Sequence, residues 1–243
     1  RSEMCIRDRL GTGKRMNKQI SEISPKMTLP MFMIGLIIFV VVAINVIHDT
    51  LLVQNVDIGS LHWLTDYFGE PERKYGDGIW HNFMTFCAEI GEVKSVIYIT
   101  LFLAIVLLFK HYKLSIWMVL TITSGTLLNY LIKQLIERQR PFNHLMRDHG
   151  YSFPSGHSNA STLLALILLI ILIPLIKLKA IRIIANTITI IIWIGVLCCR
   201  LYFHAHYITD VVGGVTLGII WVALFLMILP LFYLNLRNKP NNK

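Results

Sequence analysis

The stretch SNASTLLALILLIILIPLI, residues 158–176, runs for 19 residues without a charge. A helix of about 20 apolar residues is long enough to cross the hydrocarbon core of a bilayer. Of the 243 residues in the chain, 55% are hydrophobic and 15% are charged, and the mean hydropathy is +0.60. A soluble domain carries about 25% charged residues. The composition therefore predicts an all-α integral membrane protein.

Five further apolar runs have a length that suits membrane helices, namely residues 29–47, 95–109, 114–132, 183–199 and 211–236. The run 95–109 is the shortest, with 15 residues. It can span the membrane if the helix extends backwards, with Glu92 paired and Lys94 reaching the interface. We therefore predict a six-helix bundle over residues 28–236, with cytoplasmic tails at 1–27 and 237–243. Residues 1–15 carry no folding signal, and Met16 is a plausible natural start.

The distribution of Lys and Arg predicts the orientation of the bundle. With six spans, the side that holds both termini carries 15 of these residues and the other side carries 8. If residues 1–15 are set aside, the counts become 10 and 8. By the positive-inside rule, both termini are expected in the cytoplasm, which fits a multi-pass protein of a bacterial inner membrane. The net charge of +9 then reflects orientation and affinity for anionic lipid, and not nucleic-acid binding.

Polar residues gather in three clusters: KQLIERQRP (133–141), YSFPSGHSNAS (151–161) and CRLYFHAHYITDVVGG (199–214). Each cluster lies at a helix end that the six-span topology places on the outer face. The three clusters can therefore converge on one site at the outer membrane interface. Ionisable groups at a membrane boundary indicate function more often than chance.

In the first cluster, Lys133 and Arg140 are seven residues apart, so they share a face if the helix continues. Pro141 then ends or redirects the chain. The alternative is that these cations simply reach the lipid headgroups. Glu137 and Arg138 are assigned to that simpler role.

In the second cluster, a Pro-Ser-Gly turn precedes the apolar run, and Ser155 or Ser158 can cap the helix. The free N–H groups at a helix start attract anions, and Gly156 allows a phosphate to approach the backbone. His157 then stands at the mouth of this anion site. The alternative is an inert interfacial histidine.

In the third cluster, His206 and Asp210 are four residues apart, so the carboxylate can bond one imidazole nitrogen and make the other more basic. This is the arrangement of an oriented nucleophile or base. Arg200 lies six residues earlier and offers a two-pronged donor for phosphate oxygens. His204 points elsewhere and is taken as interfacial.

Together the motifs Lys133-x6-Arg140-Pro141, Pro154-Ser155-Gly156-His157 and Arg200-x5-His206-x3-Asp210 resemble the three-part signature of the type 2 phosphatidic acid phosphatases. These are membrane lipid phosphate phosphatases related to the vanadium haloperoxidases. The resemblance covers roughly residues 28–236. One position departs from it, because Cys199 stands where the family usually has Ser, and a thiol is a weaker donor to phosphate than a hydroxyl.

The resemblance implies a role for each matching residue. His206 attacks phosphorus and forms a phosphohistidine, and Asp210 orients it. His157 protonates the leaving group and then activates water. The phosphoryl oxygens are held by a further set of groups: Lys133, Arg140, Arg200, Ser155 and the Gly156 backbone N–H. Three fixed cations can balance the charge that Mg²⁺ balances elsewhere, and neither the four cysteines nor the acidic residues show metal-ligand spacing, so no metal or cofactor is expected.

The expected substrate is a lipid phosphomonoester or pyrophosphate, such as undecaprenyl pyrophosphate, phosphatidylglycerol phosphate or phosphatidate, and the sequence does not choose among them. The aromatic-rich segment 49–94 is expected to lie along the outer interface, either shaping the entrance or only anchoring the protein. A lipid-linked phosphotransferase that uses the same histidine is an alternative. A transporter is disfavoured because its charges would lie at mid-membrane. The oligomeric state is left open.

Overall fold

The computed structural model describes residues 20, 23 and 25–234. The predicted tails therefore lie almost wholly outside the described residues. The regular elements of the described part are helices, in the order α2 (Pro25–Ile47), α3 (Leu51–Phe68), α4 (Gly78–Ile90), α5 (Val93–Ile136), α6 (Gly156–Ile167), η1 (Leu168–Leu172), η2 (Ile173–Leu175), α7 (Lys179–Tyr202) and α8 (Ile208–Leu234). The prediction of an all-α protein is confirmed.

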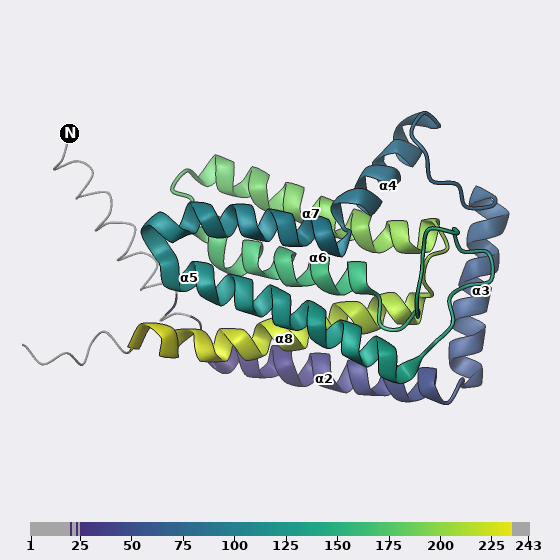
Figure 1. Cartoon of the computed structure of the whole chain (residues 1–243), viewed down its shortest axis with the longest axis horizontal. Coiled ribbons are helices and arrows are strands. Elements are labelled where there is room, and N and C mark those ends of the chain that lie inside the picture. The colour runs from purple at the N-terminus through teal and green to yellow at the C-terminus, as the bar shows by residue number, and fades with distance from the viewer. Residues whose placement is uncertain (1–19, 21–22, 24, 235–243) are drawn as a thin grey trace, which may run out of the picture.

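Within the described residues, five helical segments are long and apolar enough to cross a membrane: α2, α5, α6 with its continuation to Leu175, α7 and α8. The predicted count of six separate helices is not reproduced, because the expected second and third spans form one 44-residue element, α5. Non-helical backbone at His111 (φ −141°, ψ 54°) folds α5 into two arms, which lie alongside each other in Figure 1. One residue thus makes the reversal for which the sequence suggested a turn over 110–113.

The bundle is organised around α6, which packs against α5, α7 and α8. Its side chains Leu163 and Ile167 are fully buried, as are Trp117 of α5 and Val222 of α8. The Trp117 indole N–H also donates to the Phe225 carbonyl of α8 at 2.9 Å. The core is therefore a helix-on-helix contact made mainly by the second half of the chain.

The outer helices expose large apolar side chains, which is the pattern of a protein solvated by lipid. On α2, for example, Ile34 is 58% exposed and Val41 is 53% exposed. In water such a surface would aggregate, whereas in a bilayer it contacts hydrocarbon. The chain is an integral membrane protein.

Two glycines of α8 bring that helix close to α6. A Cβ at Gly214 would lie 2.5 Å from the Ser155 carbonyl oxygen, and one at Gly218 would lie 3.0 Å from Thr162 Cβ. Small residues at such positions let two membrane helices approach closely. The close contact also fixes the N-terminus of α6, because the Ser155 amide donates to the Asp210 carbonyl at 3.0 Å.

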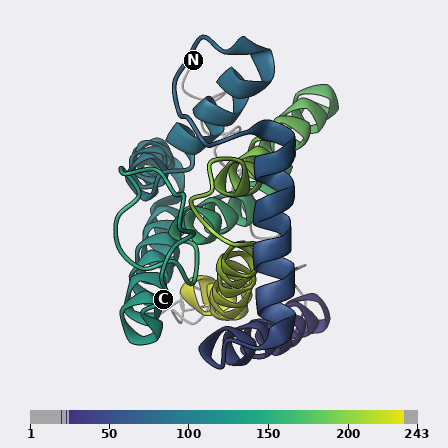
Figure 2. The ribbon, with the colours of Figure 1, turned by 90° about the vertical axis from the view of Figure 1, so that its right-hand side faces the viewer.

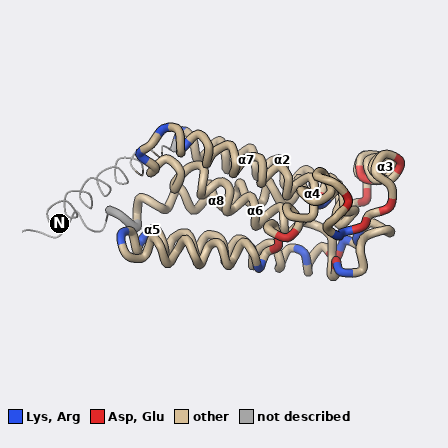
Figure 3. Tube along the Cα trace, turned by 90° about the horizontal axis from the view of Figure 1, so that it is seen from above, with Lys and Arg blue, Asp and Glu red and all other residues tan. Residues whose placement is uncertain are grey.

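The segment between α2 and α5 closes one end of the bundle. Helix α3 runs across that end, nearly perpendicular to the long helices, as Figures 1 and 2 show, and it contacts α7 and α8. Helix α4 packs on α7. The charged residues also differ between the two ends of the bundle. At the kink of α5 and the turn before α7 they are all basic, whereas the end with α3 and α4 carries both basic and acidic residues (Figure 3).

Candidate active site

The three predicted motifs meet at the end of the bundle that α3 covers. His206 lies in the turn between α7 and α8, and Asp210 lies in the first turn of α8. His206 Nδ1 is 3.5 Å from Asp210 Oδ2, and the two residues are 2% and 0% exposed. The expected approach of this histidine to this carboxylate is therefore present as an ion-pair contact, while Nδ1 makes no hydrogen bond among the described residues. It forms across the start of α8, since His206 itself precedes the helix.

The other nitrogen of His206 identifies the tautomer. His206 Nε2 is 3.1 Å from Arg140 Nη1. A guanidinium can only donate hydrogen bonds, so Nε2 must be the acceptor and the ring proton must be on Nδ1, facing Asp210. The lone pair on Nε2 therefore faces the cationic side of the site.

Burial lowers the pKa of His206 well below its ordinary value, and the charges of Lys133, Arg140 and Arg200 lower it further. The imidazole is consequently neutral near pH 7 and keeps its lone pair. A neutral, oriented imidazole is the form that can attack an electrophile.

Asp210 is held by a set of polar residues that we name the carboxylate network: Asp57, Arg138, Ser152, Thr209 and Asp210. Arg138 donates to Asp210 Oδ1 from Nη1 and to Asp57 Oδ2 from Nη2, both at 2.7 Å. The Ser152 hydroxyl donates to Asp210 Oδ2, and the Tyr207 amide donates to the same oxygen at 2.9 Å. Asp57 also accepts from the Thr209 amide at 3.1 Å. Both carboxylates are thus buried with full hydrogen-bond partners.

The assignment of Arg138 as an interfacial cation was wrong. Its side chain is 15% exposed and lies between two buried carboxylates, with its guanidinium 4.5 Å from the centre of the Tyr207 ring. Burial lowers the pKa of Arg138, but Asp210 and Asp57 together raise it above the ordinary value. Arg138 therefore stays charged and joins α3 to the start of α8.

Asp57 was missed because its partners lie far along the chain. A local signal did exist, since Val53, Asp57 and Leu61 recur every four residues and all three are buried. A carboxylate on the apolar stripe of a helix must have a buried partner. The pattern could have flagged Asp57, although it could not have identified Arg138 as the partner.

The second group of residues, which we name the cation pocket, consists of Lys133, Arg140, His157 and Arg200. Helix α5 ends at Ile136, and Glu137 has left-handed backbone (φ 53°). The helix therefore does not continue to Arg140, so the condition under which Lys133 and Arg140 would share a helix face is not met, and Glu137 is the C-cap of α5. Arg140 reaches the site from the following loop.

Three backbone carbonyls hold Arg140 in place. It donates from Nε to Gly150 at 2.9 Å, from Nη2 to His149 at 2.9 Å and from Nη1 to Ala205 at 2.7 Å. Because none of these acceptors carries a full charge, they orient Arg140 without neutralising it. Lys133, in the last turn of α5, lies within electrostatic range of Arg140, Arg200 and Asp210.

Arg200 has one acidic partner, which the sequence did not reveal. Its Nη2 is 3.0 Å from Asp148 Oδ1, and its side chain is 2% exposed. Its Nε has no hydrogen-bond partner among the described residues. An incoming phosphate could satisfy this nitrogen, because a guanidinium binds phosphate through two adjacent N–H groups.

The start of α6 is built as an anion site. Ser155 caps the helix, accepting from the Ser158 amide at 3.4 Å and from the Ser158 hydroxyl at 2.9 Å. Its own hydroxyl proton remains available to an anion. A Cβ at Gly156 would meet only Asn129 Oδ1 at 3.6 Å and Val93 at 3.7 Å, so packing does not require glycine there. The buried His157 Nε2 has no partner in the part of the chain that the structure describes.

Two other residues of the third motif differ from expectation. His204 was taken as interfacial but is 0% exposed, with positive φ (50°), so this interpretation was wrong. Cys199 is also fully buried, and its thiol lies 3.1 Å from the Val196 carbonyl one turn back on α7. The thiol therefore has a partner within its own helix.

The fold is an all-helical membrane bundle. At one end it gathers two histidines, a carboxylate and three cations from three sequence motifs, which is the kind of site that binds an anionic group. The sequence profile of the PAP2 superfamily matches residues 114–233, a range that contains all eight predicted site residues. Over this range the chain matches the PAP2 superfamily, as the resemblance of its motifs predicted.

Two relatives are similar to this chain. Phosphatidylglycerophosphatase B of Bacillus subtilis is 36% identical over 109 residues, in a match that covers 42% of this chain and 52% of that protein. The match thus spans about half the length of this relative. The crystal structure of a transmembrane PAP2-type phosphatidylglycerolphosphate phosphatase from Bacillus subtilis has a TM-score of 0.62 at 24% identity, covering 88% of this chain and 98% of that one. The second likeness establishes the fold.

Proposed function

We propose that the protein is a metal-independent lipid phosphate phosphatase that hydrolyses a lipid phosphomonoester or pyrophosphate through a phosphohistidine on His206. The observation that carries this proposal is the orientation of one imidazole. Its Nδ1 faces Asp210 at 3.5 Å, and its Nε2 faces Arg140 at 3.1 Å. A neutral nucleophile is thereby directed at the place where three cations would hold a phosphoryl group.

The proposed reaction has two steps. In the first, His206 Nε2 forms a bond to phosphorus as the bond from phosphorus to the lipid oxygen breaks, and His157 gives a proton to that oxygen. Lys133, Arg140 and Arg200 balance the charge on the equatorial oxygens, which is the main requirement of phosphoryl transfer. Asp210 stabilises the positive charge that develops on His206. In the second, His157 takes a proton from water, which attacks phosphorus and releases inorganic phosphate and neutral His206.

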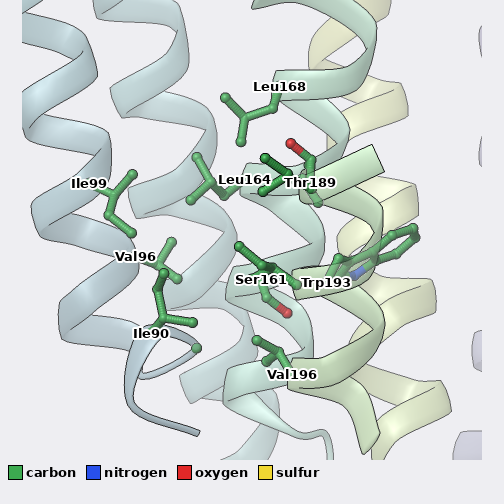
Figure 4. A pocket seen from close by; sticks show the side chains of 13 residues that line it. Ile90, Val96, Ile99, Ser161, Leu164, Leu168, Thr189, Trp193 and Val196 are labelled. Carbon is green, nitrogen blue, oxygen red and sulfur yellow. The ribbon is translucent and has the colours of Figure 1, made fainter. Parts of the chain in front are cut away.

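The structure also supports a lipid as the substrate. A groove of ≈ 220 Å³ lies between the first arm of α5, α6 and α7, within the membrane-spanning part of the bundle (Figure 4). Its lining is almost entirely apolar and includes Ile99, Leu164 and Leu168. Two other lining residues, Ser161 and Val196, lie one helical turn from His157 and Arg200 respectively. An acyl or prenyl chain in this groove would place its phosphate at the cation pocket.

The substrate we favour is a phosphatidylglycerophosphate, because both relatives are described as phosphatases of that lipid. Undecaprenyl pyrophosphate and phosphatidate are the other candidates. We further propose that the site faces the outer side of a bacterial inner membrane and that both termini are cytoplasmic. The exclusively basic turns at the end remote from the site support this orientation.

The proposal is tested by the release of inorganic phosphate from these three lipids in detergent with EDTA. The wild type is compared with His206→Ala and with His62→Ala, which removes an exposed histidine of α3. We expect release that survives EDTA, persists in His62→Ala and is lost in His206→Ala. Release that persists in His206→Ala would refute the nucleophile. Formation of a phosphorylated alcohol in place of inorganic phosphate, once an alcohol acceptor is added, would identify a phosphotransferase instead.

A further inference from the structure

A fourth cationic side chain lies near the cation pocket, and none of the three motifs contains it. Arg73 belongs to the segment between α3 and α4, outside residues 114–233. Its side chain is only 5% exposed. Arginine side chains in connecting loops are normally exposed to solvent, so this burial is unusual. The loop is held against α4 by a hydrogen bond from Thr85 Oγ1 to the Lys74 carbonyl at 3.2 Å.

The charge of Arg73 is only partly balanced. Its Nη2 lies 3.2 Å from Glu92 Oε1, but Glu92 also pairs with Lys94 at 2.9 Å. One carboxylate thus serves two cations, of which Lys94 is 72% exposed and Arg73 is buried. Arg73 Nε has no hydrogen-bond partner within the described residues. Since a buried cation needs both a counter-charge and hydrogen-bond acceptors, Arg73 is short of an anion.

Arg73 is also linked both to the apolar groove and to the proposed catalytic residues. Its partner Glu92 is the N-cap of α5, next to Gly91, and Gly91 lines the groove. A Cβ at Gly91 would overlap Val196 of α7, which shows how closely the two elements approach there. On the other side, Arg73 is one of the charges that act on His157. A lipid whose chain occupies the groove and whose terminal phosphate reaches His206 would therefore bring its headgroup near Arg73.

We propose that Arg73 binds a second phosphate group of the substrate, the one that stays with the lipid after the terminal phosphate has left. This inference rests on the proposed function. It narrows the substrate to lipids that carry two phosphates, such as a phosphatidylglycerophosphate with its phosphodiester or a prenyl diphosphate. A lipid with a single phosphate would fill the cation pocket and leave Arg73 without an anion.

Two matched variants test the proposal, since Glu92 has one buried and one exposed cation. Arg73→Gln and Lys94→Gln each remove one of the two cations that pair with the Glu92 carboxylate. We expect Arg73→Gln to lower kcat/KM by about tenfold to a hundredfold on phosphatidylglycerophosphate and on a prenyl diphosphate, the loss typical of a hydrogen bond to a charged group. On phosphatidate the loss should stay within about threefold, as should the effect of Lys94→Gln on all three lipids.

An equal loss on all three lipids would overturn the proposal and leave Arg73 a structural residue. If Arg73→Gln does not fold, Arg73→Lys keeps the charge and loses the planar fork, and the same selectivity is then expected at smaller size. A second readout is inhibition by phosphatidylglycerol, which retains the inner phosphate, and this inhibition should weaken in the Arg73 variant. Failure of the proposed function has a different signature, since it shows as inactivity of the wild type or as activity that survives His206→Ala.

Discussion

The two sides of His206 are built on opposite principles. On the Nδ1 side, the carboxylate network is complete, because Asp57 and Asp210 share Arg138 at 2.7 Å and accept further bonds from neighbouring amides and hydroxyls. On the Nε2 side, the cation pocket is incomplete, because Arg200 Nε and His157 Nε2 have no partners among the described residues. Both sides are buried, and His206 Nδ1 itself makes no hydrogen bond among the described residues, but the two carboxylates have their hydrogen bonds made whereas the cation pocket does not.

This difference separates support from binding. A satisfied buried network is rigid and holds its members in one geometry. Unsatisfied buried donors around excess positive charge are costly in the free protein and become stabilising when an anion arrives. In the proposed mechanism, the carboxylate network therefore positions the nucleophile, and the cation pocket binds the phosphoryl group. Changes on the first side should lower stability as well as rate, and changes on the second side should lower the rate without lowering stability.

The largest effect on rate is expected from Asp210→Asn. The amide cannot stabilise the positive charge on His206 or fix its tautomer, so kcat should fall by about 10²–10⁴-fold, the range for a lost acid–base partner. Phosphate release from phosphatidylglycerophosphate measures this. Asp66→Asn, at an exposed carboxylate of α3, is the control and should be unaffected. Full activity in Asp210→Asn would show that the network does not support the nucleophile.

The largest effect on stability is expected from Arg138→Ala. Removing one partner of a buried ion pair costs about 3–5 kcal/mol, and here two carboxylates would lose the same cation. A thermal unfolding series in detergent should show a marked drop in Tm, whereas Arg147→Ala, in the exposed part of the same loop, should show none. The double variant Asp57→Asn, Arg138→Gln should regain part of the loss, because it leaves one unpaired carboxylate instead of two. A double variant that is less stable than Arg138→Ala would argue against the shared pair.

A smaller effect separates binding from packing at the start of α6. Gly156→Ala meets only ordinary contacts, at 3.6 Å and beyond, so its Tm should match that of the wild type. Its kcat/KM should fall about tenfold, because the methyl group keeps phosphate from the backbone N–H and weakens one charge-assisted bond. Gly214→Ala should do the reverse and lower Tm, since its Cβ would lie 2.5 Å from the Ser155 carbonyl oxygen. Unchanged activity in Gly156→Ala would remove the α6 backbone from the phosphate site.

The smallest expected effect concerns pH: the protonation state of His206 should hardly change near neutral pH. Burial and three neighbouring cations lower the pKa of His206, so it stays neutral as the pH falls through 6.5, the ordinary pKa of a histidine. The unfolded chain also gains that proton, so His206 makes the folded state less stable as the pH falls below about 6.5. Imidazole ¹⁵N resonances, assigned with His206→Ala, should show no titration of His206 between pH 7.5 and 6. A midpoint at or above 6.5 would contradict the described surroundings.

The sequence predicted those parts of the site that are local in the chain. His206 and Asp210 are four residues apart, and Ser155 caps the run that follows it, so their closeness in the chain was enough to predict these contacts. Arg138 and Asp57 are 81 residues apart, and Arg200 and Asp148 are 52 apart, so their pairing depends on how the helices pack. The same limit applied to the fold: the apolar runs predicted the spans, but the merging of two of them at His111 depends on the backbone of a single residue.

The central claim is that His206 carries the phosphoryl group, and it can be observed directly. A lipid phosphate labelled with ³²P in its terminal group is mixed with His157→Gln, which should still be phosphorylated slowly and should hydrolyse the intermediate more slowly than the wild type. The reaction is quenched in alkali, because phosphohistidine is labile in acid, and the labelled peptide is identified by mass spectrometry. The account predicts label on His206 and none in the double variant His157→Gln, His206→Ala. Label on another residue, or turnover without label on His206, would contradict it.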